Sequence, residues 1–297
     1  MKRCKLNEKD LRALRIFRVA ALAGGFSAAE SKLHMSTATI SRHVKEIEER
    51  LNVILCTRGP QGFALTNAGE VVLQCTSETL DALDRIQPAV EATKGVISGD
   101  LNIGISDNTI SNFDFQVTKL LKAFYHRAPE VNVAIYVMPR AELKQALFNH
   151  QLDIVVSDRH MQTPSLAYTP LFSEEKKIYY SPHPINEGRD VWTLPLVTCV
   201  NHRVMEEVFR DNDFVKGPKA NSIESVVMLI STGRFLGVLP SHYAEALSFR
   251  YELRAIPQSP RYPTEFGAII NPSRPLPLSA EVLLSLIQQV HPTSPVR

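Results

Sequence analysis

The sequence predicts a small helical amino-terminal domain with a winged helix-turn-helix, followed by a larger α/β domain that has two lobes. Residues 26–51 have the spacing of two helices joined by a tight turn, and residues 57–66 have that of a hairpin that would form the wing. From residue 101 onward, strand-like and helix-like apolar patterns alternate, which predicts a parallel sheet covered by helices.

The charge of the chain is unevenly distributed. The 297 residues are enough for two or three compact domains, and 44% hydrophobic and 22% charged residues are typical of a globular protein. The net charge is only +2, but residues 1–66 hold 12 Lys and Arg against 6 Asp and Glu, whereas residues 67–297 hold 21 against 25. A basic segment on an acidic body favours a polyanionic partner for that segment, although a segment that is basic by chance is the alternative.

Several classes of protein are disfavoured by the motifs that the sequence lacks. The four cysteines are scattered without a CxxC pair, so we expect reduced thiols, a cytoplasmic location and no metal site. The amino terminus lacks the apolar region of a signal peptide, and no run approaches the roughly 18–20 apolar residues that span a membrane. GxSxG, P-loop, GxGxxG and HExxH motifs are absent, so neither an enzyme nor a cofactor is expected.

The first two helices are predicted from their caps and breaks. Asn7 is the expected cap of a helix that Gly24 and Gly25 end. Ser27 is the expected cap of the next helix, because Glu30 stands three residues on as in a capping box. A turn follows at residues 33–35.

The third helix has the pattern of one that enters a DNA groove. Ser36 is the expected cap, and the buried stripe would consist of Ile40, Val44, Ile47 and Leu51. The opposite face is polar and basic, as a helix in the major groove requires. We expect bases to be read at residues 37–39, base or phosphate contact at Arg42, and phosphate contact at Lys32 and Arg58. The alternative for each residue is an ordinary solvated surface position. The full set of candidates for DNA contact is Ser27, Lys32, Ser36, Thr37, Ala38, Thr39, Arg42, His43, Arg58 and Gln61.

A long helix that starts at Thr66 or Asn67 carries a narrow apolar stripe. The stripe steps by three or four residues through Val72, Cys75, Thr79, Leu83, Ile86 and Val90. Such a stripe favours pairing with a second copy of the chain over packing on the chain's own body, although Pro88 is expected to kink or end the helix. Gly95, Ser98 and Gly99 are the expected hinge.

The predicted α/β domain begins with buried strands near residues 101–105 and 152–156 and a strand of alternating apolar residues at 131–137. A crossing strand at residues 176–181 would lead to the second lobe, and the segments 266–270 and 279–290 would return to the first. The expected domains are 1–66 for the winged helix-turn-helix, 67–95 for the linker helix and hinge, and 96–297 for the sensor. Its first lobe would hold residues 96–172 and 265–297, and its second lobe residues 173–264.

These residues resemble the LysR-type family of bacterial transcription regulators over nearly the whole chain. The amino-terminal matches include Ser27-Ala-Ala29, Leu33, Ser36, Ser41 and Leu65-Thr66-x-Ala68-Gly69; later matches include Leu152-Asp-Ile154 and Gly233-x-x-x-Gly237-Val-Leu-Pro240. The family often has Gln-Pro or Gln-Ser after the cap serine, where this chain has Thr37-Ala38.

The resemblance implies a two-lobed, periplasmic-binding-protein-like sensor that binds a small-molecule effector. It also implies a homodimer or homotetramer, arranged as a dimer of dimers on an interrupted inverted repeat in double-stranded DNA, with RNA polymerase as a further partner and no membrane partner.

Effector candidates follow the predicted strands, because ligands of open α/β sheets bind at the carboxyl ends of strands and the amino ends of helices. Helix capping is the alternative for each residue. The arginines and histidines in the set would hold an anionic effector, whereas the carboxylates would hold an amine. The sequence does not decide between these two kinds of effector. The candidates are Ser106, Asp107, Asn108, Thr109, Arg140, Asp158, Arg159, His160, Asn201, His202, Ser222 and Glu224.

Two alternative functions share the same architecture. The sensor half would suit a solute-binding protein, but the basic helix-turn-helix argues against that role. A redox-sensing protein would need a resolving partner for Cys199, and no cysteine follows it in the chain, so we expect a packed core thiol.

Overall fold

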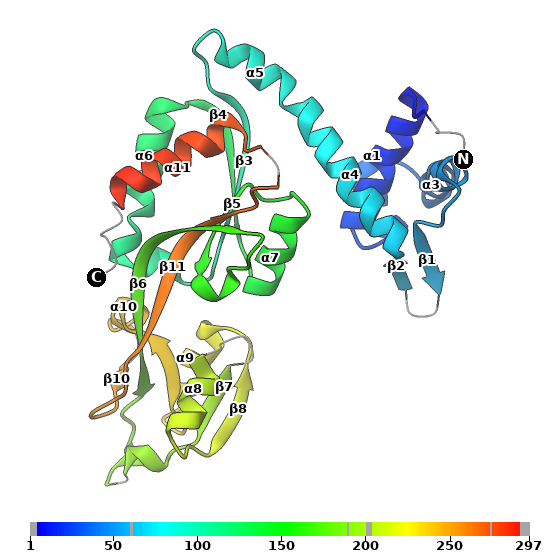
Figure 1. Ribbon diagram of the computed structural model, residues 1–297. Helices are drawn as coiled ribbons and strands as arrows, with labels where there is room; N and C mark the ends of the chain where they lie inside the picture. The colour runs from blue at the N-terminus through cyan, green and yellow to red at the C-terminus, as the bar shows by residue number, and fades with distance from the viewer. Residues whose placement is uncertain (1–4, 60–61, 189, 200–203, 274, 292–297) are drawn as a thin grey trace. The chain divides into compact units, whose positions relative to one another are not determined.

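The computed structural model describes residues 5–59, 62–188, 190–199, 204–273 and 275–291 (Figure 1). The chain divides into two compact units, Met1–Val90 and Glu91–Arg297, which are described separately. Among the described residues, no helix combines the length and the apolar character that a membrane crossing demands.

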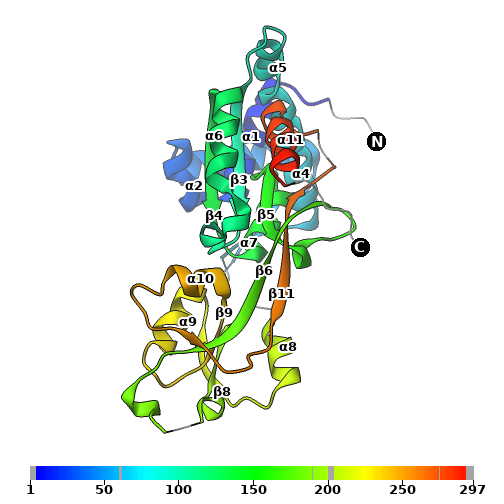
Figure 2. The same ribbon diagram turned by 90° about the vertical axis from the view of Figure 1, so that its left-hand side faces the viewer.

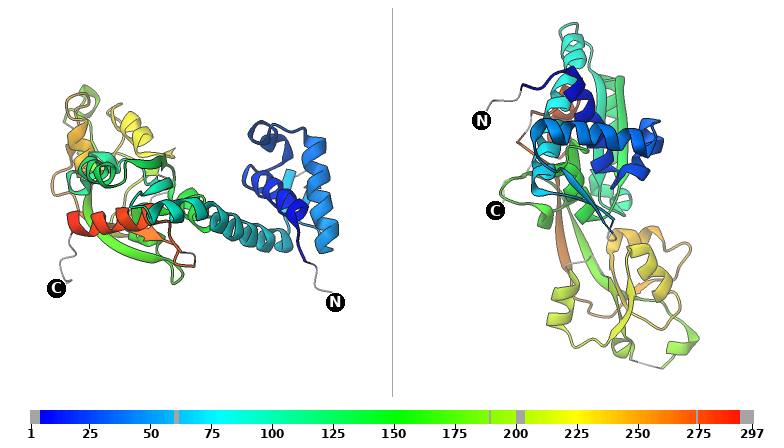
Figure 3. Two further views of the ribbon diagram at one scale, coloured as in Figure 1. Left: turned by 90° about the horizontal axis from the view of Figure 1, so that it is seen from above. Right: turned by 90° about the vertical axis from the view of Figure 1, so that its right-hand side faces the viewer.

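The first unit is a winged helix-turn-helix followed by a long helix, which can be traced in blue and cyan in Figure 3. Phe17, Ile40, Ile47 and Leu55 are fully buried in its core. Its elements are α1 (Glu8–Leu22), α2 (Phe26–Leu33), α3 (Thr37–Leu51), β1 (Cys56–Gly59), β2 (Gly62–Leu65) and α4 (Asn67–Asp84); α5 (Ile86–Ala92) contains the boundary between the units.

Side-chain caps start three of these helices. The Asn7 side chain accepts from the amides of Lys9 and Asp10 and forms a capping box, as predicted for α1. Ser36 caps α3 and Thr66 caps α4 by accepting from backbone amides in the first turn.

The predicted Ser27 cap is wrong. Gly25 is the N-cap residue of α2, its φ of 150° is one that glycine adopts readily, and the helix therefore begins at Phe26, two residues earlier than a cap at Ser27 would place it. Ser27 lies exposed within the first turn. The predicted interruption at Pro88 is confirmed, because α4 ends at Asp84 and Pro88 lies in the separate helix α5.

The sheet of the second unit is mixed rather than purely parallel. Strands β3 (Ser98–Ile105), β4 (Glu130–Val137) and β5 (Ile154–Asp158) are parallel, as predicted, whereas β11 (Tyr262–Ile270) runs antiparallel to β5 and to β6 (Ala167–Tyr180). The strand order is β10-β6-β11-β5-β3-β4, with β9 paired to β6. Ser98 and Gly99 therefore belong to β3, and of the predicted hinge only Gly95 lies in a turn.

Helices cover both faces of this sheet in the first lobe (Figure 2). Ile154 and Val156 of β5 lie in the core cluster that includes α6 (Val117–Arg127) and α11 (Leu278–Val290), whereas Val155 lies in the cluster that includes α7 (Arg140–Phe148). Successive side chains of one strand thus pack on opposite faces. The predicted return of the chain to this lobe is confirmed by β11 and α11.

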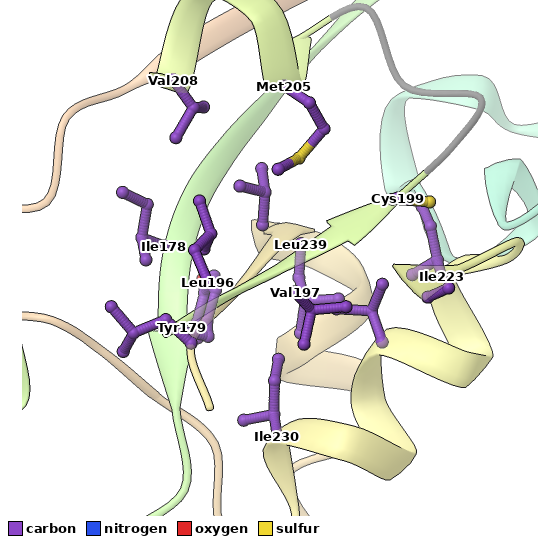
Figure 4. Packing of buried hydrophobic residues seen from close by; sticks show 14 of the residues in the cluster. Ile178, Tyr179, Leu196, Val197, Cys199, Met205, Val208, Ile223, Ile230 and Leu239 are labelled. Carbon is purple, nitrogen blue, oxygen red and sulfur yellow. The ribbon is translucent and has the colours of Figure 1, made fainter. Parts of the chain in front are cut away.

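The second lobe has its own core, of which ten residues are labelled in Figure 4. Its elements are β7 (Leu196–Cys199), α8 (Val204–Asp211), β8 (Lys216–Ala220), α9 (Ile223–Ile230), β9 (Gly237–Pro240), α10 (Ser241–Ala246) and β10 (Arg254–Ala255). Short 3-10 helices lie at Thr109–Ser111, Phe113–Phe115, Arg159–Met161, Pro184–Asn186 and Val191–Thr193.

Two strands connect the lobes. The β6 strand pairs with β11 from Ala167 to Lys176 and then with β9 and β10 in the second lobe. It begins well before the predicted strand 176–181. The prediction was too short because the segment before Lys176 is polar and contains a proline, which masks its strand pattern in the sequence. A bulge between Phe266 and Gly267 interrupts the β6–β11 ladder.

Candidate nucleic-acid interface and interlobe cleft

The amino end of α3 is held by side chains of its own motif. The Ser36 Oγ accepts from the Thr39 amide at 3.3 Å and lies 2.9 Å from the Thr39 Oγ1. The Glu30 carboxylate on α2 accepts from both the amide and the hydroxyl of Thr37, which lowers the pKa of Glu30. The hydroxyls of Thr37 and Thr39 therefore have partners within the protein, and Glu30 ties α2 to α3.

The outer face of α3 keeps exposed polar and cationic groups. Ser36, Ala38 and Arg42 are exposed, and Thr37, Thr39 and His43 are partly exposed. The Arg42 Nε lies 3.7 Å from Glu46, and the His43 Nδ1 lies 3.0 Å from the same carboxylate. Surface pairs of this length are weak, so Arg42 can exchange Glu46 for a phosphate or a base at little cost.

The wing is attached to the helices by packing and by hydrogen bonds. Phe63 of β2 lies with its ring 5.7 Å from that of Phe26, and Arg58 stands opposite Phe63 in the hairpin ladder. The Thr66 Oγ1 donates to the Ile54 carbonyl at 2.6 Å. Gln61 lies outside the described residues. Lys32, the remaining predicted phosphate contact, is exposed at the end of α2.

Helix α4 presents two different faces. Leu73, Thr76, Ser77 and Leu80 are buried, and Arg18 of α1 lies 3.2 Å from Asp81. The predicted pairing stripe lies elsewhere: Cys75, Thr79, Leu83, Ile86 and Val90 are exposed, and Val72 is partly buried. An apolar groove lies beside this stripe and is lined in part by Leu6, Leu11, Leu14, Leu51 and Val71. The chain's own contacts therefore use one face of α4 and leave the predicted stripe uncovered within this unit.

A cleft with a cavity of about 100 Å³ lies between the two lobes of the second unit. Seven predicted effector residues line it: Ser106, Asp107, Asn108, Arg140, Asp158, His160 and Ser222. The structure thus brings together residues from the ends of β3 and β5 and the starts of α7 and α9, as expected for an open α/β sheet.

The other predicted effector residues do not line the cleft. Thr109 is buried and its hydroxyl donates to the Ser106 carbonyl at 3.0 Å. Arg159 pairs with Glu265 at 2.7 Å, and Glu224 lies in the first turn of α9. Asn201 and His202 lie outside the described residues.

Residues of the crossing strands also line the cleft, although they were not predicted from the sequence. Glu174 and Lys176 of β6 and Thr264 and Phe266 of β11 are the main examples. The sequence did offer one signal for Glu174 and Lys176: residues 174–177 are all charged and lie beside a strand pattern. Lys and Glu are rarely buried unless they are paired, so charges in a strand indicate buried ion pairs.

Buried charges in the cleft form a chain that reaches both lobes. The Lys176 Nζ lies 2.9 Å from the Glu174 Oε1, and the His242 Nε2 of α10 lies 3.0 Å from the Glu174 Oε2. The His242 Nδ1 is 2.9 Å from the Ser111 Oγ of the first lobe. Burial alone would raise the pKa of Glu174, but Lys176 and His242 outweigh it and lower that pKa.

A second ion pair lies at the first-lobe wall of the cleft. The Arg140 Nη1 donates to both carboxylate oxygens of Asp158, at 3.1 and 3.3 Å. The pKa of Asp107 is raised, mainly by loss of hydration and secondly by the negative charge of Glu224. The Asp107 side chain is nevertheless exposed at the cleft. Cys199 is buried at the end of β7.

Comparisons with known proteins match both units. Residues 11–70 match the model of the bacterial regulatory helix-turn-helix protein, lysR family, and residues 94–292 match the LysR substrate binding domain. The HTH-type transcriptional activator BauR from Pseudomonas aeruginosa is 33% identical over 248 residues, which cover 81% of each chain.

Two full-length solved structures share the fold. An OxyR variant from Pseudomonas aeruginosa superposes with a TM-score of 0.67 at 21% identity, covering 97% of this chain and 98% of that one. CbnR in complex with its target DNA superposes with a TM-score of 0.61 at 18% identity, covering 94% and 99%. The chain therefore belongs to the LysR family of transcriptional regulators, with an amino-terminal helix-turn-helix domain for DNA and a carboxyl-terminal effector-binding domain.

Proposed function

We propose that this regulator binds an interrupted inverted repeat in double-stranded DNA and that a small molecule in the interlobe cleft controls the arrangement of the bound protomers. The observation that carries this proposal is α3, a Ser36-capped helix with a buried apolar stripe and an exposed polar face, joined to α2 by a tight turn. Residues 1–66 would read DNA, residues 67–95 would link protomers, and residues 96–297 would sense the effector.

Base reading is proposed to centre on Ala38 and Arg42. Ala38 offers a methyl group to thymine, and Arg42 is the exposed cation one turn further along α3. Thr37 and Thr39 would contribute their methyl groups, because their hydroxyls have partners in the protein. Phosphate contacts would come from the remaining candidates, which are Ser27, Lys32, Ser36, His43, Arg58 and Gln61.

Assembly is proposed to use the exposed stripe of α4 and α5. Two DNA-reading helices must stand one or more helical turns apart on the duplex, which a homodimer provides. The stripe through Cys75, Leu83 and Ile86 is apolar and exposed, and the groove beside it offers apolar surface to a second copy. Two such dimers would form a homotetramer.

The cleft is proposed as the effector site. It lies where the strand ends of the first lobe meet the amino end of α9, and the lobes are joined by only two strands among the described residues. Effector binding would change the lobe angle and so the way in which protomers meet, provided that the effector binds the two arrangements unequally. RNA polymerase is the proposed downstream partner and the cytoplasm the proposed site of action, with no catalysis, cofactor or metal involved.

The experiment is a footprint of the purified chain on the DNA upstream of its own gene and its neighbours. Protection of two half-sites in successive major grooves is expected, together with loss of sequence preference in Arg42→Ala. The control is Glu49→Gln, which alters an exposed charge of α3 that is paired with Lys45. Equal affinity for the upstream fragment and a scrambled duplex at moderate salt would refute the proposal.

A further inference from the structure

A hydrogen-bonded contact joins the two lobes in addition to the crossing strands β6 and β11. The Nδ1 atom of His242, at the start of α10 in the second lobe, lies 2.9 Å from the Oγ atom of Ser111 in the first lobe. The Nε2 atom of the same ring lies 3.0 Å from the Oε2 atom of Glu174 on β6. Only 11% of the His242 side chain is exposed, so water replaces these partners poorly. The imidazole therefore bridges the first lobe and the crossing strand from within the second lobe.

The number of protons decides in which charge state all of these contacts are hydrogen bonds. The Ser111 hydroxyl has one proton, and it donates that proton to the Asn108 carbonyl at 3.0 Å. Its oxygen can then only accept from His242, so Nδ1 must carry a proton. The ionised Glu174 carboxylate, which also pairs with Lys176, has no proton to give, so Nε2 must carry one as well. The complete set of contacts therefore requires the doubly protonated, cationic imidazolium.

A neutral imidazole cannot keep every one of these bonds. With its proton on Nε2, the lone pair of Nδ1 faces Ser111, and the hydroxyl must turn away from Asn108 to donate to it. With its proton on Nδ1, the lone pair of Nε2 faces the carboxylate of Glu174. Loss of one proton from His242 thus removes one hydrogen bond from the contact between the lobes in either tautomer.

Strand β6 supplies the charges that touch His242. Helix α10 packs chiefly against β6, β9 and the 3-10 helix Thr109–Ser111, and the last two hold no charged side chain. On β6, Glu174 and Lys176 are buried on one face of the strand, whereas Glu175 and Lys177 alternate with them and pair with each other at 2.8 Å. The imidazolium therefore shares the carboxylate of Glu174 with the ammonium group of Lys176.

Carboxylates at longer range favour the imidazolium. Glu245 is exposed on α10 and stands three residues after His242, on the same side of the helix. Loss of hydration, and after it the negative charges of Glu224 and Asp107, raise the pKa of the neighbouring Tyr243. These carboxylates offset the repulsion between a protonated His242 and Lys176, so the surrounding charges do not oppose the state that the proton count requires.

We propose that His242, Ser111 and Glu174 form a pH-sensitive latch between the two lobes, which holds the lobes together most firmly when His242 is an imidazolium. Histidine is the side chain whose charge ordinarily changes between about pH 5 and 8. The imidazolium makes one more bond in the latched state than the neutral ring does. The latch is therefore strengthened as the pH falls through this range and weakened as the pH rises.

The latch is continuous with the cleft. Asn108, whose carbonyl accepts from Ser111, lines the cleft, and so do Glu174 and Lys176. A change in pH consequently alters the same lobe arrangement that an effector in the cleft would alter. The latch itself is inferred from the contacts of the second unit, whereas its effect on DNA binding rests on the proposed function.

The experiment is hydrogen exchange of the full chain, followed by mass spectrometry at about pH 6 and pH 8 and corrected for the intrinsic pH dependence of exchange. Peptides that cover residues 106–116 and 241–250 report on the two sides of the latch. We expect their corrected exchange to be about tenfold slower at pH 6 than at pH 8, which corresponds to one hydrogen bond to a charged group. Peptides of α1, in the other unit, should show no such difference.

Two variants and a control connect this response to the latch. His242→Gln keeps one donor and one acceptor, as a neutral imidazole does, but it does not titrate. Its exchange should be the same at both pH values and equal to that of the unmodified chain at pH 8. Ser111→Ala removes the acceptor of Nδ1 and should also lose the pH response. The control His126→Gln removes an exposed histidine of α6 and should keep the response.

The pH response separates a latch from a merely structural role, because a structural histidine would affect exchange equally at both pH values. Corrected exchange that does not change with pH in the unmodified chain, that is slower at pH 8, or that keeps its pH response in Ser111→Ala would overturn the inference. Ser111→Ala decides the matter if His242→Gln does not fold.

Operator binding by the same preparations tests the proposed function separately. A chain that prefers its operator but shows no pH response in exchange would keep the proposed function and lose the latch. A chain whose exchange follows pH as expected but that has no operator preference would keep the latch and refute the proposed function.

Discussion

Gly69→Ala tests how closely α4 is packed beneath the wing. Gly69 is the third residue of α4 and is buried. A Cβ added there would lie 1.9 Å from the carbonyl oxygen of Leu55 and 2.9 Å from its carbonyl carbon, both of them backbone atoms. Real Cβ contacts stay beyond 3.0 Å, so either α4 or the segment between α3 and β1 must move.

The steric cost should exceed the gain in helix propensity. Alanine gains at most about 1 kcal/mol over glycine inside a helix, and overpacking costs typically about 1–3 kcal/mol and occasionally more. The upper part of that range applies, because the clash is with backbone and the Leu55 carbonyl already accepts from the Thr66 amide at 3.0 Å. A net loss of about 2 kcal/mol should lower the melting temperature of the amino-terminal unit by roughly 8–16 °C.

The assay is differential scanning calorimetry of the full chain, in which the two units can unfold in separate transitions. Only the transition of the amino-terminal unit should move, and operator binding should weaken at the same temperatures. Gln74→Ala, at an exposed position of the same helix, should change stability by no more than about 0.5 kcal/mol. A melting temperature that is unchanged or raised in Gly69→Ala would refute the reasoning.

Three further predictions concern charge and assembly. Arg58→Ala should weaken binding to all DNA sequences and reduce the slope of log affinity against log salt by about one; an unchanged slope would remove Arg58 from the interface. Because Lys176 and His242 hold the pKa of Glu174 below 4.5, the stability that this carboxylate contributes is present above pH 4.5 and is lost as the pH falls through the lowered value. Glu174→Gln should therefore flatten the acid side of the stability profile measured by urea unfolding, and an unaltered profile would contradict this linkage. Leu83→Lys should yield monomers in sedimentation experiments, whereas an unchanged mass would place the pairing surface elsewhere.

Local patterns predicted the amino-terminal unit well because its determinants are close in sequence. The Asn7 and Ser36 caps and the buried positions Ile40, Val44 and Ile47 were all identified from spacing alone. The Ser27 cap failed because two conditions competed: the serine satisfies a capping-box pattern, but Gly25 lets the chain enter the helix earlier. Glu30, assigned to that box, instead accepts from Thr37 of the next helix.

The cleft could be predicted only from its strand ends. Asp107 and Arg140 follow strands and Asp158 ends one, and a general rule for α/β sheets brings such positions together. Glu174 and Thr264 are brought together by the pairing of β6 with β11, which are far apart in sequence. No local pattern encodes that register, so the buried chain from Lys176 to Ser111 was not foreseen.

The second lobe is an insertion whose two ends meet. Ser173 and Glu265 are directly opposed in the antiparallel ladder of β6 and β11, where paired Cα atoms lie roughly 5 Å apart. Residues 173–264 could therefore be exchanged as a cassette with the corresponding segment of a relative, with both junctions at neighbouring points of one ladder. Such chimaeras would replace the second-lobe wall of the cleft and would leave the amino-terminal unit and the parallel strands of the first lobe intact.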